Sequence, residues 1–309
     1  MRDLLAPQSW DAALASRGQP GVGGAQPVAP RAQARAQLVL DRVHGSMIAH
    51  GPQPDVALSV LGTAVLLFVP GPGPNLEDMT TTLITGGNRG LGRETARRLV
   101  EAGHDVWLAT RDPERGQAAA EELGARFVEL DVTDERSVRA AAERVAAESG
   151  SLDVLINNAG ISGDRKPVGE VTAEDLQRVF DTNVYGIVRT THAFLPLLER
   201  SQNPAIVNVS SGMGSITITS DPARIESTFV GLPYPASKTA VNMLTSQYAK
   251  AYPHMRINAV DPGYTATDFN GHRGTKPVEQ GAEIIVRLAS ADGDATTGAF
   301  VDENGPVPW

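Results

Sequence analysis

Two side chains suited to proton transfer stand four residues apart in the second half of this sequence. Tyr234 and Lys238, in the letters YPASK, open a run with helical character, so both project from one face of the expected helix. A free tyrosine titrates at about pH 10. An adjacent ammonium group favours the phenolate and so brings the pKa of the tyrosine toward the working pH. We therefore predict that Tyr234 exchanges a proton with the substrate and that Lys238 lowers the pKa of its phenol.

A pair of serines, Ser210 and Ser211, ends the strand expected before that helix. A hydroxyl group at this place could polarise a substrate carbonyl. Neighbouring residues of a strand face opposite sides, so one serine is expected to face the substrate and the other to pack inward. The Tyr and Lys spacing alone would also suit an ordinary amphipathic helix, and the serine pair is what favours the catalytic interpretation.

A glycine-rich turn, TGGNRGLG, directly follows the first expected strand and opens onto a helix that begins near Leu91. Gly86, Gly90 and Gly92 would let the backbone approach a pyrophosphate, and the unpaired N–H groups of a helix N-terminus attract such an anion. Glycine-rich turns also serve as plain connectors. The TGGNRGLG turn lies between an expected strand and an expected helix, and this position favours a dinucleotide-binding site.

Short apolar runs alternate with helical patterns from Met79 onward, which predicts a parallel sheet built from βαβ units. Helix ends are legible between the runs, because Asp112 followed by Pro113 is a helix start and Gly124 a helix end, while Thr133 or Asp134 starts the next helix. The expected strands cover residues 80–85, 105–110, 125–131, 152–157, 205–210 and 256–260. We predict a single α/β domain over 79–309, a doubly wound Rossmann sheet.

The first 78 residues differ from the rest in being interrupted by stretches rich in Gly and Pro. We expect residues 1–78 to be a poorly ordered extension, dispensable for the fold. The apolar run from Val56 to Val69 could suggest a membrane anchor, but it spans 14 residues against about 20 needed to cross a bilayer. A short buried or loosely packed segment is the preferred interpretation.

The net charge and the content of cysteine and histidine exclude several classes of binding partner and site. The net charge of −9 argues against nucleic acid or an anionic membrane, which would demand a basic face. The chain has no cysteine, so it needs no oxidising compartment, and we expect a cytoplasmic protein. His104, His192 and His254 stand at no metal-ligand spacing, so no metal site is expected. The oligomeric state stays open, a homo-oligomer included.

Several motifs together give region 79–309 a strong resemblance to the short-chain dehydrogenase/reductase family, most of all to its carbonyl-reductase-type members. TGGNRGLG resembles the family's cofactor loop, and LDVTD the end of its adenine-side strand. NNAG resembles its sheet-stabilising turn, DTNVYG its helix asparagine, and DPGYTAT its nicotinamide-side segment. The resemblance implies an NAD(P)-dependent oxidoreductase that moves a hydride to or from a carbonyl carbon.

The same resemblance implies roles for individual residues. The catalytic set would be Asn183, which anchors a water for proton relay, Ser211, which orients the carbonyl, Tyr234, which exchanges the proton, and Lys238, which holds the ribose. The dinucleotide would contact Gly86, Asn88, Arg89, Gly90, Leu91, Arg111, Asp131, Val132, Asn158, Ala159, Gly160, Tyr234, Lys238, Pro262, Gly263, Thr265 and Thr267. The family placement favours Ser211 over Ser210. The segment 214–233, longer than in the shortest members, is expected beside the active site, where it would shape substrate choice.

NADPH is the expected cofactor, rather than NADH. NAD-binding enzymes usually place a carboxylate about 20 residues beyond the glycine turn, and this chain has Thr110 there, followed by Arg111, whose guanidinium suits a 2′-phosphate. Arg89 can add a second positive charge. Asp112 is a nearby carboxylate, but the proline after it predicts that its side chain caps a helix.

The favoured function is NADPH-dependent reduction of a ketone, aldehyde or quinone-like carbonyl. Two alternatives stay open. The same fold could oxidise an alcohol, because the cofactor ratio in the cell sets the direction. A dinucleotide-sensing protein without catalysis would tolerate loss of the Ser, Tyr and Lys set, all of which is present here.

Overall fold

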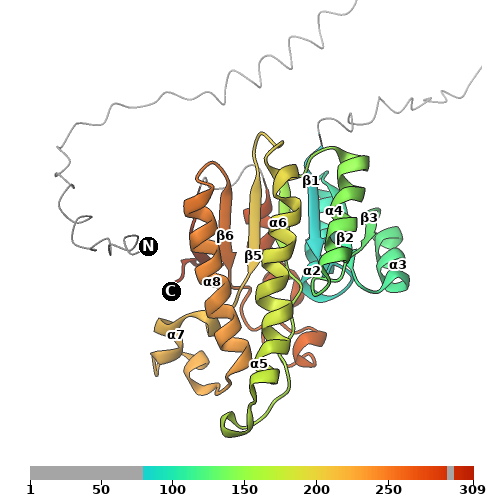
Figure 1. Ribbon diagram of the computed structural model, residues 1–309. Coiled ribbons are helices and arrows are strands. Elements are labelled where there is room, and N and C mark those ends of the chain that lie inside the picture. The colour runs from blue at the N-terminus through green and yellow to red at the C-terminus, as the bar shows by residue number, and fades with distance from the viewer. Residues whose placement is uncertain (1–78, 291–295) are drawn as a thin grey trace, which may run out of the picture. The chain divides into compact units, whose positions relative to one another are not determined.

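Parallel strands form the centre of the molecule (Figure 1). The structure, a computed structural model, describes residues 79–290 and 296–309. Its sheet has the order β3-β2-β1-β4-β5-β6-β7-β8, in which all neighbours are parallel except β7 and β8. The strands are β1 (Thr81–Thr85), β2 (Asp105–Thr110), β3 (Arg126–Glu129), β4 (Val154–Asn157), β5 (Ala205–Val209), β6 (Arg256–Val260), β7 (Phe300–Asp302) and β8 (Gly305–Pro306). The doubly wound parallel sheet expected from the sequence is confirmed.

Six of these strands were predicted, and their ends differ from the expected ones by at most two residues. The sequence interpretation missed β7 and β8, which are three and two residues long. Such short strands carry no readable alternation or apolar run. They exist because β7 pairs with β6 and β8 folds back on β7, so the tertiary structure supplies their hydrogen bonds.

Helices follow the strands along the chain. They are α2 (Gly90–Glu101), α3 (Pro113–Leu123), α4 (Glu135–Ser149), α5 (Ala173–Phe180), α6 (Gly186–Leu198), α7 (Ile216–Ser220), α8 (Pro233–Ala251) and α9 (Val278–Ala289). The predicted caps of α3 are confirmed, because the Asp112 side chain accepts a hydrogen bond from the Arg115 N–H at 3.1 Å and Gly124 adopts a φ of 69°. Of the two residues predicted to start α4, Asp134 is the N-cap.

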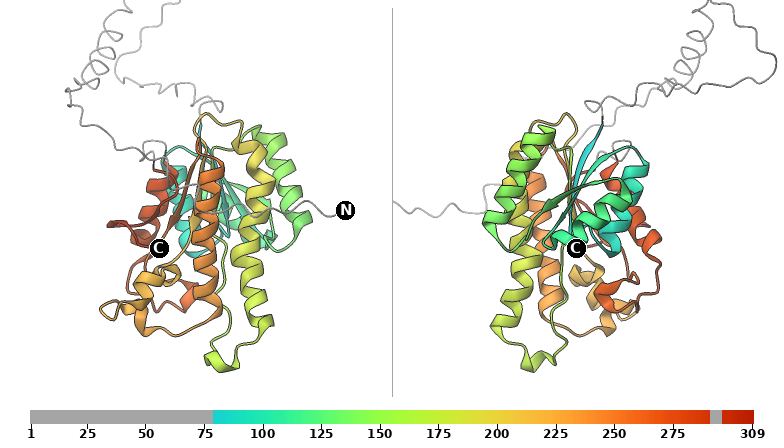
Figure 2. Two further views of the ribbon diagram at one scale, coloured as in Figure 1. Left: turned by 60° about the vertical axis from the view of Figure 1, so that its left-hand side comes forward. Right: turned by 90° about the vertical axis from the view of Figure 1, so that its right-hand side faces the viewer.

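The sheet has a hydrophobic core on each face, since alternate residues of its strands point to opposite sides. Leu83 and Trp107 join a core with residues of α4, α6 and α8, whereas Ile84 and Leu108 join one with residues of α2, α3 and α9. The views in Figure 2 show helices on both faces of the strands. A parallel sheet buried on both faces explains why its strands read as nearly continuous apolar runs.

The carboxyl ends of the parallel strands lie at the lower end of the sheet in Figure 1, where α5 and α7 are also found. Ligands of doubly wound folds bind at this end, near the point where the strand order reverses. Here that point lies between β1 and β4. The glycine turn follows β1 and the NNAG turn follows β4, so the topology brings both motifs to one place.

Residues 1–78, with the apolar run from Val56 to Val69, lie outside the described residues. Within the described ranges, no helix is both long and apolar enough to cross a membrane.

Candidate active site

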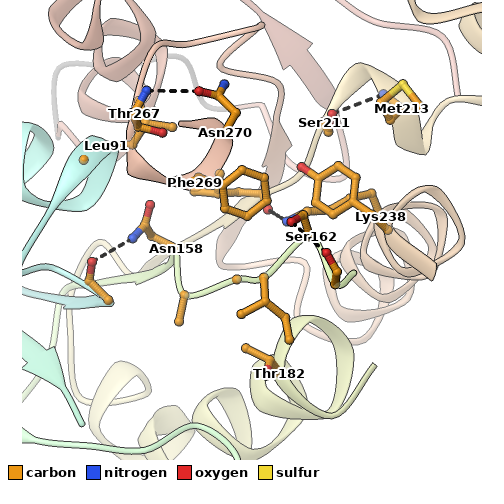
Figure 3. A pocket seen from close by; sticks show the side chains of 18 of the residues that line it. Leu91, Asn158, Ser162, Thr182, Ser211, Met213, Lys238, Thr267, Phe269 and Asn270 are labelled. Atoms are coloured by element: carbon orange, nitrogen blue, oxygen red, sulfur yellow. Dashed lines mark hydrogen bonds between the residues drawn. The ribbon is translucent and has the colours of Figure 1, made fainter. Parts of the chain in front are cut away.

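A continuous cavity of about 740 Å³ runs along the carboxyl ends of the strands. All of the predicted site residues line it except Asn183. From the cofactor set these are Gly86, Asn88, Arg89, Gly90, Leu91, Arg111, Asp131, Val132, Asn158, Ala159, Gly160, Pro262, Gly263, Thr265 and Thr267, and from the catalytic set Ser211, Tyr234 and Lys238. Residues from the six loops that follow β1 to β6, and from the start of α8, therefore meet at one cavity, as Figure 3 shows for part of its lining.

The glycine turn needs its glycines for two physical reasons. Gly86 and Gly90 have φ angles of 65° and 52°, a region that other residues rarely adopt. At Gly92 a Cβ atom would come within 2.5 Å of Asn158 Nδ2 and 2.6 Å of the Gly86 carbonyl oxygen, so no larger residue fits. The Asn158 amide in turn donates to the Thr85 carbonyl oxygen at 2.8 Å and to the Gly86 carbonyl oxygen at 3.2 Å, which ties the NNAG turn to the end of β1.

The start of α2 fits an anionic group. Its N-cap, Arg89, makes no side-chain hydrogen bond to the helix, and the first turn contains no acidic residue. The first N–H groups of the helix are therefore left for an external acceptor at the positive end of the helix dipole. A dinucleotide pyrophosphate is the group that this turn and helix start would hold.

Two arginines lie on the loops that follow β1 and β2. Arg89 and Arg111 both line the cavity and are exposed. Within the described part of the chain, neither guanidinium group is in an ion pair or a side-chain hydrogen bond. Asp112 is engaged as the N-cap of α3, and its carboxylate also lies 3.4 Å from the Arg115 Nε.

The residues after β3, which were expected to contact adenine, also line the cavity. Asp131 Oδ1 accepts hydrogen bonds from Thr133 N–H at 2.9 Å and from the Thr133 hydroxyl at 2.7 Å. These bonds close a tight turn that presents Asp131 and the mostly buried Val132 to the cavity. The side chain of Asp131 is thus used for local structure as well as facing the cavity.

Tyr234 and Lys238 lie in the first turns of α8, on one face of the helix. The Lys238 Nζ is 5.6 Å from the centroid of the Tyr234 ring and donates to the Val209 carbonyl oxygen at 2.7 Å. Val209 is the last residue of β5, so this bond holds the start of α8 against the strand that leads to the two serines. Gly214 lies against the Lys238 backbone so closely that a Cβ would come within 2.7 Å.

The structure separates the roles of the two serines. The Ser210 side chain is buried and donates to Asn242 Oδ1 at 2.6 Å. The Ser211 hydroxyl accepts from the Met213 N–H at 3.2 Å (Figure 3), and its hydrogen bonding with Tyr234 acts to lower the pKa of the tyrosine. The geometry therefore places the Ser211 hydroxyl, and not that of Ser210, beside the tyrosine.

One expectation about the proton chemistry is wrong for this structure. Lys238 was expected to lower the pKa of Tyr234, but burial raises the pKa of Tyr234 to about 12, and only the hydrogen bond with Ser211 acts in the opposite direction. The ammonium lies over the ring and donates a hydrogen bond to a backbone carbonyl oxygen. Burial also lowers the pKa of Lys238 to about 8, while the negative charge of Asp261 raises both values.

Asn183 lies behind the cavity wall in η4, a π-helical turn over Asp181–Tyr185 between α5 and α6. Its side chain is buried, accepts from the Ile161 N–H at 2.8 Å and donates to the Ile161 carbonyl oxygen at 2.9 Å and to the Ser237 hydroxyl at 3.0 Å. Asn183 thus joins the loop after β4 to α8. Single π-helical turns inside α-helices often occur at functional sites.

Comparison with known proteins decides the family. A family profile described as short chain dehydrogenase matches residues 80–277. This chain belongs to the short-chain dehydrogenase/reductase family. It is therefore an NAD(P)-dependent oxidoreductase, and the resemblance seen in its motifs is confirmed.

Relatives of this short-chain dehydrogenase include several characterised oxidoreductases. A short-chain dehydrogenase of Penicillium roqueforti is 38% identical, over 67% of this chain and 87% of that protein. The (+)-neomenthol dehydrogenase of Capsicum annuum is 31% identical, over 72% of this chain and 96% of that protein. Among solved structures, the NADPH-bound carbonyl reductase from chicken fatty liver is 29% identical with a TM-score of 0.67, covering 75% of this chain and 99% of that one.

Some residues of the cavity were not assigned a role from the sequence of this short-chain dehydrogenase. Asp261 at the end of β6 is buried, and its carboxylate accepts from the N–H groups of Gly263 and Gly212, which links the DPGYTAT segment to the serine loop. The sequence signal that could have indicated a role for Asp261 is its position directly after an apolar strand. Phe269 packs on Tyr234 with ring centroids 5.5 Å apart, a contact that sequence spacing does not reveal.

The segment before α8 lies where it was expected, beside the active site. Residues 225, 226 and 229–233 line the cavity together with Ser211, Tyr234 and Lys238, the side chains predicted to be catalytic. In the described residues, no group of three or more His, Cys, Asp or Glu side chains is arranged to hold a metal ion.

Proposed function

We propose that this short-chain dehydrogenase reduces a ketone, aldehyde or quinone-like carbonyl to the alcohol with NADPH. The observation that supports this most is the meeting of Ser211, Tyr234 and Lys238 in the cavity that also contains the glycine turn. A group that can hold a carbonyl oxygen and a group that can protonate it thus share one space with the dinucleotide-binding elements. When bound, the nicotinamide supplies the hydride.

Each of the four predicted catalytic residues has a defined task in this proposal. The Ser211 hydroxyl orients the carbonyl oxygen, and Tyr234, protonated because its pKa is raised, donates a proton to that oxygen. Lys238 binds the ribose hydroxyls next to the nicotinamide, with its ammonium 5.6 Å from the centroid of the Tyr234 ring. Asn183 keeps the loop after β4 and α8 at a fixed separation, and a water that it anchors could resupply the proton.

The preference for NADPH is part of the proposal. It is supported by the two exposed arginines at the cavity, by the absence of a carboxylate at position 110 and by the use of Asp112 as a helix cap. The carbonyl reductase from chicken fatty liver was solved with NADPH bound. Oxidation of an alcohol in the same site is the second candidate, favoured by the relative named as a neomenthol dehydrogenase.

Consumption of NADPH with a panel of carbonyl compounds tests the function. The panel contains small dicarbonyls, simple ketones, aldehydes and quinones, and the reverse reaction is followed with the matching alcohols and NADP⁺. Carbonyl-dependent oxidation of NADPH supports the proposal. Binding of NADPH without turnover of any compound in either direction would favour a dinucleotide-sensing protein instead.

The pH dependence of reduction follows from the two catalytic groups. A lysine is charged below its pKa, so Lys238 keeps its ammonium up to about pH 8, while Tyr234 stays protonated up to about pH 12. We expect kcat/KM for reduction to be highest below about pH 8 and to fall as the pH rises through this value. The measurement is a pH–rate profile at fixed ionic strength.

Asp261 provides a variant with a defined direction. Its negative charge raises the pKa of Lys238, so Asp261→Asn should move the fall in rate to lower pH. Glu148→Gln serves as the control, since Glu148 is exposed, is paired with Arg144 at 2.9 Å and does not line the cavity. A profile that stays flat across pH 8, or an Asp261→Asn profile displaced to higher pH, would contradict this assignment.

We further propose that residues 79–309 are the catalytic domain and that the protein works in the cytoplasm, the latter supported by the absence of cysteine. Expression of 79–309 alone tests the boundary, because an insoluble or inactive product beside an active full chain would show that the first 78 residues belong to the fold.

A further inference from the structure

Large apolar side chains that remain exposed are concentrated at one place on this protein. Among the described residues, six of them line the active-site cavity, namely Ile225, Phe229, Val230, Leu232, Tyr264 and Phe269. Val230 is 85% exposed and Phe229 47% exposed. Single exposed apolar residues need no explanation, whereas a group of them around one cavity indicates a binding site.

These side chains come from two walls that face each other. Ile225 belongs to η6 (Ile225–Thr228), and Phe229, Val230 and Leu232 follow it in the segment before α8. Tyr264 and Phe269 come from the loop after β6. The rings of Phe229 and Tyr264 have centroids 6.1 Å apart, so the two walls are in contact.

The apolar walls reach the catalytic residues. Phe269 packs on the Tyr234 ring with centroids 5.5 Å apart, and Figure 3 shows Phe269, Ser211 and Lys238 around the same space. A substrate whose carbonyl oxygen contacts Ser211 and Tyr234 must therefore place its body against these aromatic side chains.

The carboxylates at these walls are already paired. Glu226 Oε1 lies 3.3 Å from an Arg224 nitrogen, and Asp268 Oδ1 lies 2.8 Å from His272 Nε2. Paired groups offer little to a charged substrate. Within the described residues, Arg165 on the loop after β4 and Arg273 on the loop after β6 are exposed cations at the cavity without an ion pair, so an anionic substrate is the alternative to be tested.

We propose that the natural substrate is an uncharged ketone carried on a hydrocarbon ring, and that Phe229 and Val230 select it. The proposal rests on the carbonyl-reducing function proposed above. Aromatic walls bind a rigid apolar body well, because both sides lose little conformational freedom and burial of apolar surface stabilises the complex. An open chain of the same size would lose rotational freedom that the ring has already lost.

Three ketones separate the possibilities. 4-tert-Butylcyclohexanone is an apolar ring ketone, 2-decanone has the same number of carbon atoms in an open chain, and 4-oxocyclohexanecarboxylate is an anionic ring ketone. We expect kcat/KM to be about tenfold or more higher for the first than for either of the others. A preference for the carboxylate would overturn the proposal in favour of a role for Arg165.

Variants test whether the named residues make the selection. Phe229→Ala and Val230→Ser should each lower kcat/KM for 4-tert-butylcyclohexanone by about tenfold and change the value for 4-oxocyclohexanecarboxylate much less. Val168→Ser is the matched control, because Val168 is also exposed but lies outside the cavity. Equal losses for all three ketones, or no loss beyond that of the control, would overturn the assignment to these residues.

Binding separates a failure of this inference from a failure of the proposed reaction. Titration calorimetry of the NADP⁺-loaded protein with 4-tert-butylcyclohexanone measures binding without turnover. If the ketone binds, Phe229→Ala weakens this binding and no ketone is reduced, the proposed ligand class is supported and the proposed reaction is contradicted. Reduction of ketones without preference for the apolar ring would remove the substrate class and leave the reaction standing.

Discussion

Replacement of Tyr234 by phenylalanine is expected to lower kcat for carbonyl reduction by at least about 100-fold, the usual contribution of general acid catalysis. The ring would still pack on Phe269 and over the start of α8, so the cavity should keep its shape. The variant loses the proton that reaches the substrate oxygen and the hydrogen bond with Ser211. NADPH binding should change little, because the glycine turn and both arginines are untouched.

Steady-state kinetics and a fluorescence titration with NADPH measure the two effects separately. Tyr252→Phe is the control for loss of a phenol oxygen, since Tyr252 lies at the other end of α8 and away from the cavity. If Tyr234→Phe keeps more than about a tenth of kcat, another group donates the proton, and the Ser211 hydroxyl beside it would be the first to examine.

A preference for NADPH over NADH is expected to be about 10- to 100-fold in kcat/KM. Hydrogen bonds to a charged group contribute about 1.5–3 kcal/mol, which corresponds to that range. Arg111 is exposed at the cavity and, within the described residues, without an ion pair, so its guanidinium is free to meet a 2′-phosphate. The double variant Thr110→Asp with Arg111→Ala should reverse the preference, because a carboxylate repels the phosphate and accepts hydrogen bonds from the ribose of NADH.

The ratio of kcat/KM for the two cofactors is the measurement. Arg139→Ala is the matched control, an exposed arginine on α4 that does not line the cavity. Equal use of NADH by the wild type would contradict the assignment of Arg111. An unchanged ratio in the double variant would contradict it too, and would direct attention to Arg89.

Local sequence determined the strands of the sheet and the glycine-rich turn that is predicted to hold the cofactor. The strands β1, β2 and β4–β6 are buried on both faces and therefore appear as apolar runs, and the caps of α3 depend on neighbouring residues alone. The glycines of the TGGNRGLG turn are similarly constrained, by φ angles and by close contact with Asn158. Such features can be interpreted from a few adjacent letters because their physical cause is local.

The tertiary structure decided the chemistry at the substrate end. Only packing showed that Ser210 is held by Asn242 while Ser211 meets Tyr234, and that burial and not Lys238 sets the direction of the tyrosine pKa. These outcomes depend on how much water each group loses and on which distant residue it meets. The contact between Phe229 and Tyr264 joins two apolar walls that are distant in the sequence, and it could not be predicted from local letters. The same holds for β7, which forms by pairing with the distant strand β6, and for β8, which pairs with β7.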